Sequence, residues 1–230
     1  SRDWSSDVCS SDLFDVGAFN TDLEGQTRAA ASLFNGAADR VSSFATATDR
    51  HYHIVHSNIV DAYRVDKNYD FMRTHTMRNA SAAALFEHEI DIYLYASGYG
   101  YSELNLRGSE SLANIDAILL PLISPGKLRM ICANAGEARV EKTIKIASDP
   151  VVRSMLDVCA QRAKERARSL GATKNCSRCA KCYRTMATLD AIGEIDNFAG
   201  VFDVPYYRNT RDVILADLRR RAAESPIDRS

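Results

Sequence analysis

Hydrophobic and polar residues follow two different periods along this chain, and the two periods predict different elements. Short runs of β-branched and aromatic residues predict strands over 52–56, 90–96 and 128–133, and residues 13–17 look like the end of a further buried strand. Apolar residues at helical spacing predict helices over 23–34, 37–48, 77–88, 140–147, 183–192 and 211–223. The pair Asn35-Gly36 is expected to separate the first two helices.

Strands that alternate with helices of this length predict an α/β fold with a mostly parallel, doubly wound sheet. Right-handed crossovers would place helices on both faces of that sheet. We expect this α/β domain over 14–150 and a helical region over 151–230. Ligands of such sheets bind beyond the carboxyl ends of the strands, which here are residues 17–20, 57–58 and 97–101.

Composition and charge restrict the class of protein and the partners that we expect. It has 230 residues, of which 46% are hydrophobic and 26% are charged, as in an ordinary globular protein. The formal net charge of -1 gives no field that would attract nucleic acid or an anionic membrane, so neither is an expected partner. The longest apolar stretch, 115–123, contains Asp116 and Pro121 and is far shorter than the roughly 20 residues of a membrane span. We expect a soluble, cytoplasmic chain.

The first thirteen residues differ from the rest of the chain. They are dense in Ser and Asp, show no periodicity and do not begin with Met. They resemble translated adaptor sequence, so we predict that 1–13 are foreign to the fold; a genuine disordered tail is the alternative. If the segment is foreign, Cys9 carries no information about the fold.

Four cysteines form the most specific chemical pattern in the sequence. Cys176, Cys179 and Cys182 are three residues apart, and Cys159 lies sixteen intervening residues before them. Four thiolates complete a closed tetrahedral zinc site, and a C-x2-C turn can place two of them on one metal. The distant fourth cysteine would join two parts of the chain through the metal. The sequence therefore predicts a structural zinc bound by these four residues.

Two other interpretations of the cysteines stay open. Iron–sulfur clusters also use C-x2-C-x2-C spacing, and the thiols could instead be unligated or form disulfides, although no export signal is evident. Arg178, Lys181 and Arg184 would offset the negative charge of four thiolates on a divalent ion. Cys132 lies in the apolar run 128–133 and is predicted to be a small buried residue.

Several short motifs, in their order along the chain, resemble those of a known superfamily. The chain is similar to the PP-loop ATP pyrophosphatases, which have the adenine nucleotide alpha-hydrolase-like (HUP) fold, and among them to the 7-cyano-7-deazaguanine synthases of queuosine biosynthesis. The cysteine knuckle, residues 176–182, matches the zinc site of those synthases in order and step. The other matching segments are 14–17 (FDVG, similar to FDYG), 78–79 (similar to GRN), 97–99 in a glycine-rich loop, and 121–122 followed by Lys142.

The chain departs from this superfamily at several points. Its phosphate loop, S-G-G-x-D-S, should precede residue 14 by about one βα unit and is absent here. The first cysteine is further from the knuckle than in the synthases, His75-Thr76-Met77 replaces a proline–glycine turn, and 136–142 resembles a less characterised branch. We expect a piece of a longer enzyme, lacking its first βα unit, that does not bind ATP well.

The resemblance implies a chemistry for the longer protein. PP-loop enzymes adenylate a carboxylate or carbonyl substrate with release of pyrophosphate, and catalysis is mainly positioning and neutralisation of phosphate charge. It implies ATP and Mg as cofactors beside zinc, and a small-molecule substrate. Arg78, Arg139 and Lys142 are the candidate catalytic cations. Each could equally be a solvated surface charge.

The resemblance and the predicted strand ends also suggest residues that contact the cofactor. Each of them has a structural alternative: a loop cap for Asp15, a helix cap for Asn79 and an ordinary surface turn for Gly98. The candidate cofactor-binding residues are Asp15, Gly17, Asn58, Arg78, Asn79, Gly98 and Tyr99.

Two hypotheses for the function follow. The first is an ATP-dependent ligase-like enzyme whose C-terminal region is held by zinc. The second is a non-catalytic α/β binding or scaffold domain in which zinc joins two parts of the chain. A homo-oligomer is compatible with both.

Overall fold

The computed structural model describes residues 10–17, 27–63, 70–106, 111–159 and 174–224. The chain forms two compact units, Ser1–Gly136 and Glu137–Ser230, which are treated separately below. The predicted boundary at residue 150 therefore falls inside the second unit. The helix predicted over 140–147 belongs with the cysteines rather than with the strands.

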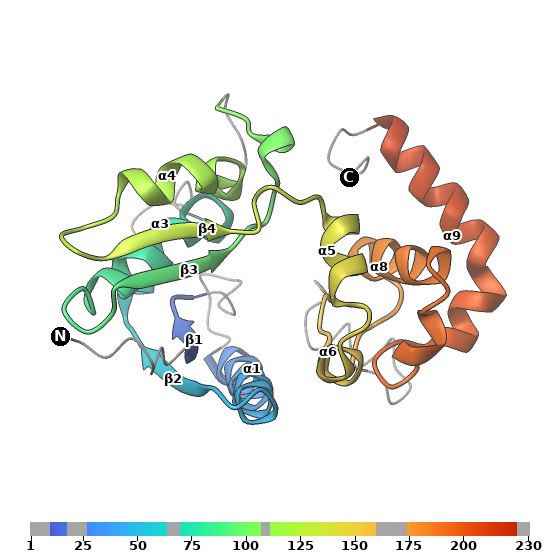
Figure 1. Cartoon of the computed structure of the whole chain (residues 1–230), viewed down its shortest axis with the longest axis horizontal. Helices are drawn as coiled ribbons and strands as arrows, with labels where there is room; N and C mark the ends of the chain where they lie inside the picture. Colours follow the sequence, from blue (N-terminus) through green and yellow to red (C-terminus); the bar gives the residue numbers. More distant parts are fainter. Residues whose placement is uncertain (1–9, 18–26, 64–69, 107–110, 160–173, 225–230) are drawn as a thin grey trace. The chain divides into compact units, whose positions relative to one another are not determined.

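The first unit is mixed α/β. Its strands are short, and helices lie between them along the chain (Figure 1). The order of its main elements is β1 Ser10–Asp15, α1 Thr27–Ala47, β2 His51–His56, α2 Ile59–Ala62, α3 Phe71–Ala84, β3 Ile92–Ala96, α4 Asp116–Leu122 and β4 Arg129–Ala133.

The strands form two parallel pairs. β1 pairs with β2 from Ser10↔His51 to Asp15↔His56, and β3 pairs with β4 from Ile92↔Arg129 to Ala96↔Ala133. Among the described residues, no ladder of hydrogen bonds joins the two pairs into one sheet. The parallel direction was predicted from the intervening helices. Residues 10–13, which were predicted to be foreign to the fold, take part in β1, since strand pairing uses backbone groups whatever the side chains.

The core of the first unit lies between α3, α4 and the β3–β4 pair. Leu120, Leu128 and Met130 are almost fully buried there, together with Ala83. Cys132 belongs to the same cluster and is 8% exposed, so it is the small buried residue that the sequence predicted.

Two predicted helix boundaries in this unit are wrong. α1 is one helix that runs through Asn35-Gly36, because the burial of Phe34 and Ala37 outweighs the roughly 1 kcal/mol that an interior glycine costs. α3 begins at Phe71 rather than near residue 77. Its cap is Asp70, whose carboxylate accepts a hydrogen bond from the backbone N–H of Arg73 at 3.0 Å.

The described part of the second unit is helical. Its helices surround one hydrophobic cluster, and the largest fully buried members of that cluster are Met186, Leu189, Phe198, Phe202 and Tyr207. Cys176 and Cys182 belong to the same cluster. The elements are α5 Arg139–Ile146, α6 Pro150–Met155, α8 Ala180–Ala191, the 3-10 turn Ile195–Phe198 and α9 Val204–Glu224 (Figure 1).

A search of the described helices for membrane-crossing segments finds none with enough length and apolar character to span a bilayer.

Candidate metal centre

The second unit brings the four predicted cysteines together. The Sγ atoms of Cys159, Cys176, Cys179 and Cys182 all lie within 4.8 Å of one another. The Sγ of Cys182 is 3.7 Å from that of Cys176 and 3.4 Å from that of Cys179. None of the four is in a disulfide. These residues could bind a metal ion such as zinc.

Local structure explains how the knuckle directs three thiols to one point. Cys179 is the N-cap residue of α8 and Cys182 lies in its first turn, so both thiols sit at the positive end of the helix dipole. Ser177 has a φ of 56°, which turns the chain sharply between Cys176 and the helix. The backbone N–H of Arg178 donates to Cys176 Sγ at 3.4 Å. A helix start and a left-handed turn therefore shape this side of the site.

Asn175 fixes Cys159 to the knuckle. Its side-chain Oδ1 accepts hydrogen bonds from the backbone N–H groups of Val158 at 2.9 Å and Cys159 at 3.1 Å. Its Nδ2 donates to the carbonyl oxygens of Leu156 at 2.8 Å and Val201 at 3.1 Å. Asn175 is fully buried, so these bonds form away from water. One amide thus joins three segments of the chain beside the thiols.

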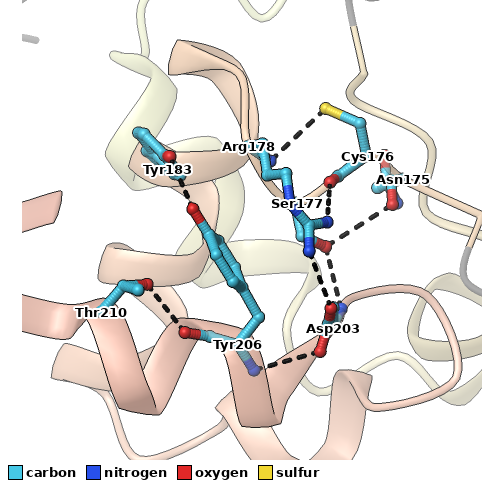
Figure 2. Close-up of polar contacts among 8 residues, drawn as sticks. All are labelled: Asn175, Cys176, Ser177, Arg178, Tyr183, Asp203, Tyr206 and Thr210. Atoms are coloured by element: carbon cyan, nitrogen blue, oxygen red, sulfur yellow. Dashed lines mark hydrogen bonds and ion pairs between the residues drawn. The ribbon is translucent and has the colours of Figure 1, made fainter. Parts of the chain in front are cut away.

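A second set of contacts anchors the knuckle to the start of α9 (Figure 2). The hydroxyl of Ser177 accepts from the backbone N–H of Asp203 at 2.8 Å. The guanidinium of Arg178 donates to Asp203 Oδ2 at 3.4 Å and lies over the ring of Tyr206, 4.1 Å from its centroid. The hydroxyl groups of Tyr206 and Tyr183 are 3.1 Å apart. These bonds hold the knuckle against α9 through protein groups alone.

Two of the crowded thiols, Cys176 and Cys182, resist ionisation unless a cation is present. Burial, the largest cause, raises the pKa of Cys176 to about 11. The hydrogen bond from Cys179, followed by burial, raises the pKa of Cys182 far above its usual range. Metal binding requires thiolates and releases their protons. The centre therefore suits a divalent cation, whose charge would offset the cost of four thiolates in one place.

The spacing of the sulfur atoms bears on the three interpretations of the cysteines. Ligands of one ion converge on a point, whereas the thiolates of an iron–sulfur cluster bind separate iron atoms and lie further apart. Four sulfur atoms within 4.8 Å of one another therefore fit a single ion. None of the four forms a disulfide within this group.

The three cations that were expected to offset the thiolates take different places. Arg178 contacts the knuckle itself, since its Nη1 donates to the carbonyl oxygen of Cys176 at 3.1 Å. Burial, and then Arg139, lower the pKa of Lys181, while the thiols of Cys179 and Cys159 act in the opposite direction. Arg184 lines a cavity beside α5 and α9.

In the first unit, Arg78 and Gly17 lie together. Arg78 is 4% exposed, so it is not the solvated surface charge that one interpretation predicted. Its Nη1 donates to the carbonyl oxygen of Val16 at 3.3 Å and its Nε donates to Thr74 Oγ1 at 2.8 Å. A Cβ atom on Gly17 would lie 3.0 Å from Arg78 Nη1. Through the bond to Val16, Arg78 connects α3 to the residues that follow β1.

The other candidate cofactor residues have structural partners or an exposed position. The side-chain amide of Asn79 donates to the carbonyl oxygen of His75 at 2.8 Å, and because Asn79 lies inside α3 it caps nothing. Asp15 Oδ2 lies 4.0 Å from His56 Nδ1. Asn58 is the exposed N-cap residue of α2 and makes no side-chain cap bond.

Gly98 and Tyr99 lie in the loop after β3. A Cβ atom on Gly98 would meet Ala113 Cβ at 3.2 Å, so the absence of a side chain lets the loop approach its neighbour closely. Tyr99 is half-buried. Arg139 and Lys142 lie in the second unit, on α5.

A buried polar cluster in the first unit was not predicted from the sequence. The hydroxyl of Thr76 donates to Asp116 Oδ1 at 2.7 Å, and His75 Nδ1 lies 3.1 Å from both Thr76 Oγ1 and Tyr95 Oη. Asp116 is fully buried, and its Oδ2 has no hydrogen-bond partner within the described part of the chain. Burial, the largest cause, raises the pKa of Asp116 to about 6.

Comparison of the chain with known protein families, with curated proteins and with solved structures finds no match. Function is therefore inferred from the residues and their geometry.

Proposed function

We propose that the second unit is a structural zinc module whose metal is held by Cys159, Cys176, Cys179 and Cys182. The convergence of four thiols within 4.8 Å, none of them in a disulfide, carries this proposal. Closed sites with four protein ligands are structural, because no position is left for water or substrate. The ion would join the segment after α6 to the start of α8 and thereby complete the core that contains Cys176 and Cys182.

Metal content is the property that tests this proposal. We expect about one zinc per chain in elemental analysis of the purified protein, since four thiolates saturate one tetrahedral ion. Cys179→Ala should lose most of that zinc. Cys132→Ala is the matched control, because Cys132 is also buried and outside any disulfide but belongs to the other unit. Equal zinc content in both variants, or iron in place of zinc, would refute the proposal.

We propose, as a second and broader function, that the first unit is part of a PP-loop ATP-dependent ligase that adenylates a carboxylate or carbonyl substrate. The parallel strand pairs and the glycine at the end of β1 support this proposal. Ile92, Leu94 and Ile131 are 38% to 58% exposed on β3 and β4. Parallel sheets are normally covered on both faces, so this exposed apolar face suits a sheet that further elements would cover.

The reading frame upstream in the source DNA distinguishes the enzyme from the scaffold. The ligase hypothesis expects S-G-G-x-D-S within about 40 residues before Phe14, the length of one βα unit. The extended chain should then bind ATP with Mg, through backbone N–H groups of that loop, and this chain should not. A frame without the motif would favour the non-catalytic α/β binding or scaffold domain.

A further inference from the structure

Two of the four thiols belong to one C-x2-C segment at the start of α8, and they differ in exposure. Cys179 is the N-cap residue and is partly exposed, whereas Cys182 lies in the first turn and is 0% exposed. Their Sγ atoms are 3.4 Å apart. An accessible cysteine with a buried second cysteine beside it is the arrangement that oxidation-sensitive thiols adopt, in which the second thiol resolves the oxidised first one.

The surroundings of Cys179 are electropositive. The N-cap position lies at the positive end of the α8 dipole. The side chain of Lys181 is exposed and interacts electrostatically with the thiols of Cys179 and Cys159. Reactive cysteines occur in partly exposed, electropositive places, and a bound zinc ion keeps its cysteine ligands in the nucleophilic thiolate form.

The other two thiols are placed less well to react with the Cys179 sulfur. Cys176 is fully buried, and its sulfur accepts a hydrogen bond from the backbone N–H of Arg178 at 3.4 Å (Figure 2). Cys159 comes from another segment of the chain, after α6. A bond between Cys179 and Cys182, by contrast, requires movement within a single helical turn.

We propose that Cys179 is an oxidation site at which hydrogen peroxide forms a disulfide with Cys182 and thereby releases the metal. This proposal rests on the zinc module proposed above. The Cys179 thiolate attacks one peroxide oxygen, the O–O bond breaks, and hydroxide leaves to give a sulfenic acid. The Cys182 thiolate then attacks the Cys179 sulfur, so that the S–S bond forms and a second hydroxide leaves. Two electrons pass from the thiolates to peroxide, and the two hydroxides take up protons to give water.

This reaction removes two of the four metal ligands. Cys159 and Cys176 remain, and two thiolates do not complete a closed tetrahedral site. The free energy of zinc binding, which stabilises the folded state, is then lost. Oxidation of Cys179 would therefore control the stability of the second unit.

Peroxide treatment of the zinc-loaded full chain, in the absence of reductant, tests the proposal. A chromophoric chelator measures zinc release, and mass spectrometry after alkylation of the remaining thiols identifies the disulfide. Trypsin places the three knuckle cysteines on separate peptides, 175–178, 179–181 and 182–184, so the linked pair can be assigned by mass. We expect peptides 179–181 and 182–184 to become linked at the rate at which zinc is released, and dithiothreitol with added zinc to reverse both changes. A disulfide mainly between another pair, or zinc release without a disulfide, would overturn the proposal.

Two variants keep four metal ligands but differ in the thiolates that remain. Histidine also binds zinc, so Cys179→His and Cys159→His each offer three cysteines and one histidine. Peroxide should release zinc from Cys179→His at least about tenfold more slowly than from Cys159→His, because the thiolate is the nucleophile and only the latter variant retains it at position 179. Cys132→Ala, in the other unit, should behave as the wild type does. Equal release rates from the two histidine variants would contradict the assignment.

Failure of the zinc module would be recognised separately. A chain that contains no zinc before treatment would refute both proposals. A chain that contains zinc and keeps it in peroxide would refute only the oxidation site.

Discussion

The side chain of Asn175 joins the chain segments around the thiols by hydrogen bonds. Replacement by Ala would remove the acceptor of the half-buried Val158 N–H and leave the N–H of Cys159 with only its longer bond, 3.3 Å, to Asp157 Oδ1. We expect Asn175→Ala to weaken zinc binding roughly 10- to 100-fold, as removal of groups that orient metal ligands does. Competition with a chromophoric chelator measures this affinity. Asn197→Ala, which removes an exposed amide from the same unit, should change it little.

Asp116 predicts a pH dependence of the first unit. Its pKa rises from 3.8 to about 6 on folding, so the folded state binds more protons between these two pH values. The free energy of unfolding should therefore fall as pH rises from about 4 to 6, by at most about 3 kcal/mol, and then level off. Asp116→Asn, which keeps an acceptor for Thr76, should flatten this dependence in urea unfolding measured at several pH values. An unchanged slope would contradict the assignment.

At the scale of residues, the sequence identified the thiols but not their supports. Cys176, Cys179 and Cys182 were predictable because metal ligands in one turn require a fixed spacing. Asn175 and Asp116 carry no such signal. Their roles arise from contacts with residues distant in the chain, such as Val201 and Thr76.

At the scale of elements, the end of β1 depends on Gly17. Its φ is +88°, and a Cβ atom there would lie 2.8 Å from Val60 Cγ2. We expect Gly17→Ala to destabilise the first unit by about 2 kcal/mol or more, from backbone strain together with the clash.

Gly126→Ala is the matched control for this prediction. Gly126 also has a positive φ, 49°, but its added Cβ would meet the flexible end of Glu87, which can move aside. Its cost in urea unfolding should therefore be smaller. Equal losses in the two variants would mean that the contact with Val60 contributes nothing.

The existence of most elements followed from the periodicity of the sequence, whereas several helix boundaries did not. β2, β3, β4, α5 and α8 lie within a few residues of their predicted positions. The start of α3 was missed because the segment 71–76 has no apolar stripe, and its Thr and His side chains are buried in polar contacts instead. Tertiary contacts thus determined what local preference could not.

At the scale of the whole molecule, the proposed zinc site belongs to only one of the two units. Removal of zinc should therefore loosen the second unit and leave the first one folded, because binding free energy is folding free energy where a site forms only in the native state. Hydrogen exchange with and without a chelator can measure the loss of protection in each unit separately. Protection should fall in α8 and α9 and persist in α3 and α4. Equal loss in all four helices would contradict this independence.

The arrangement of strands was the least predictable property. Alternating strands and helices correctly indicated parallel pairs, but local patterns do not specify which pairs share hydrogen bonds. The cysteine pattern, by contrast, correctly predicted that Cys159 lies beside the knuckle, although sixteen residues separate it from Cys176.

Zinc K-edge X-ray absorption of the purified chain tests the central claim most directly. A single structural ion held by Cys159, Cys176, Cys179 and Cys182 predicts a shell of four sulfur atoms at about 2.3 Å. A first shell with nitrogen or oxygen ligands, or a sample in which the metal is iron, would contradict it.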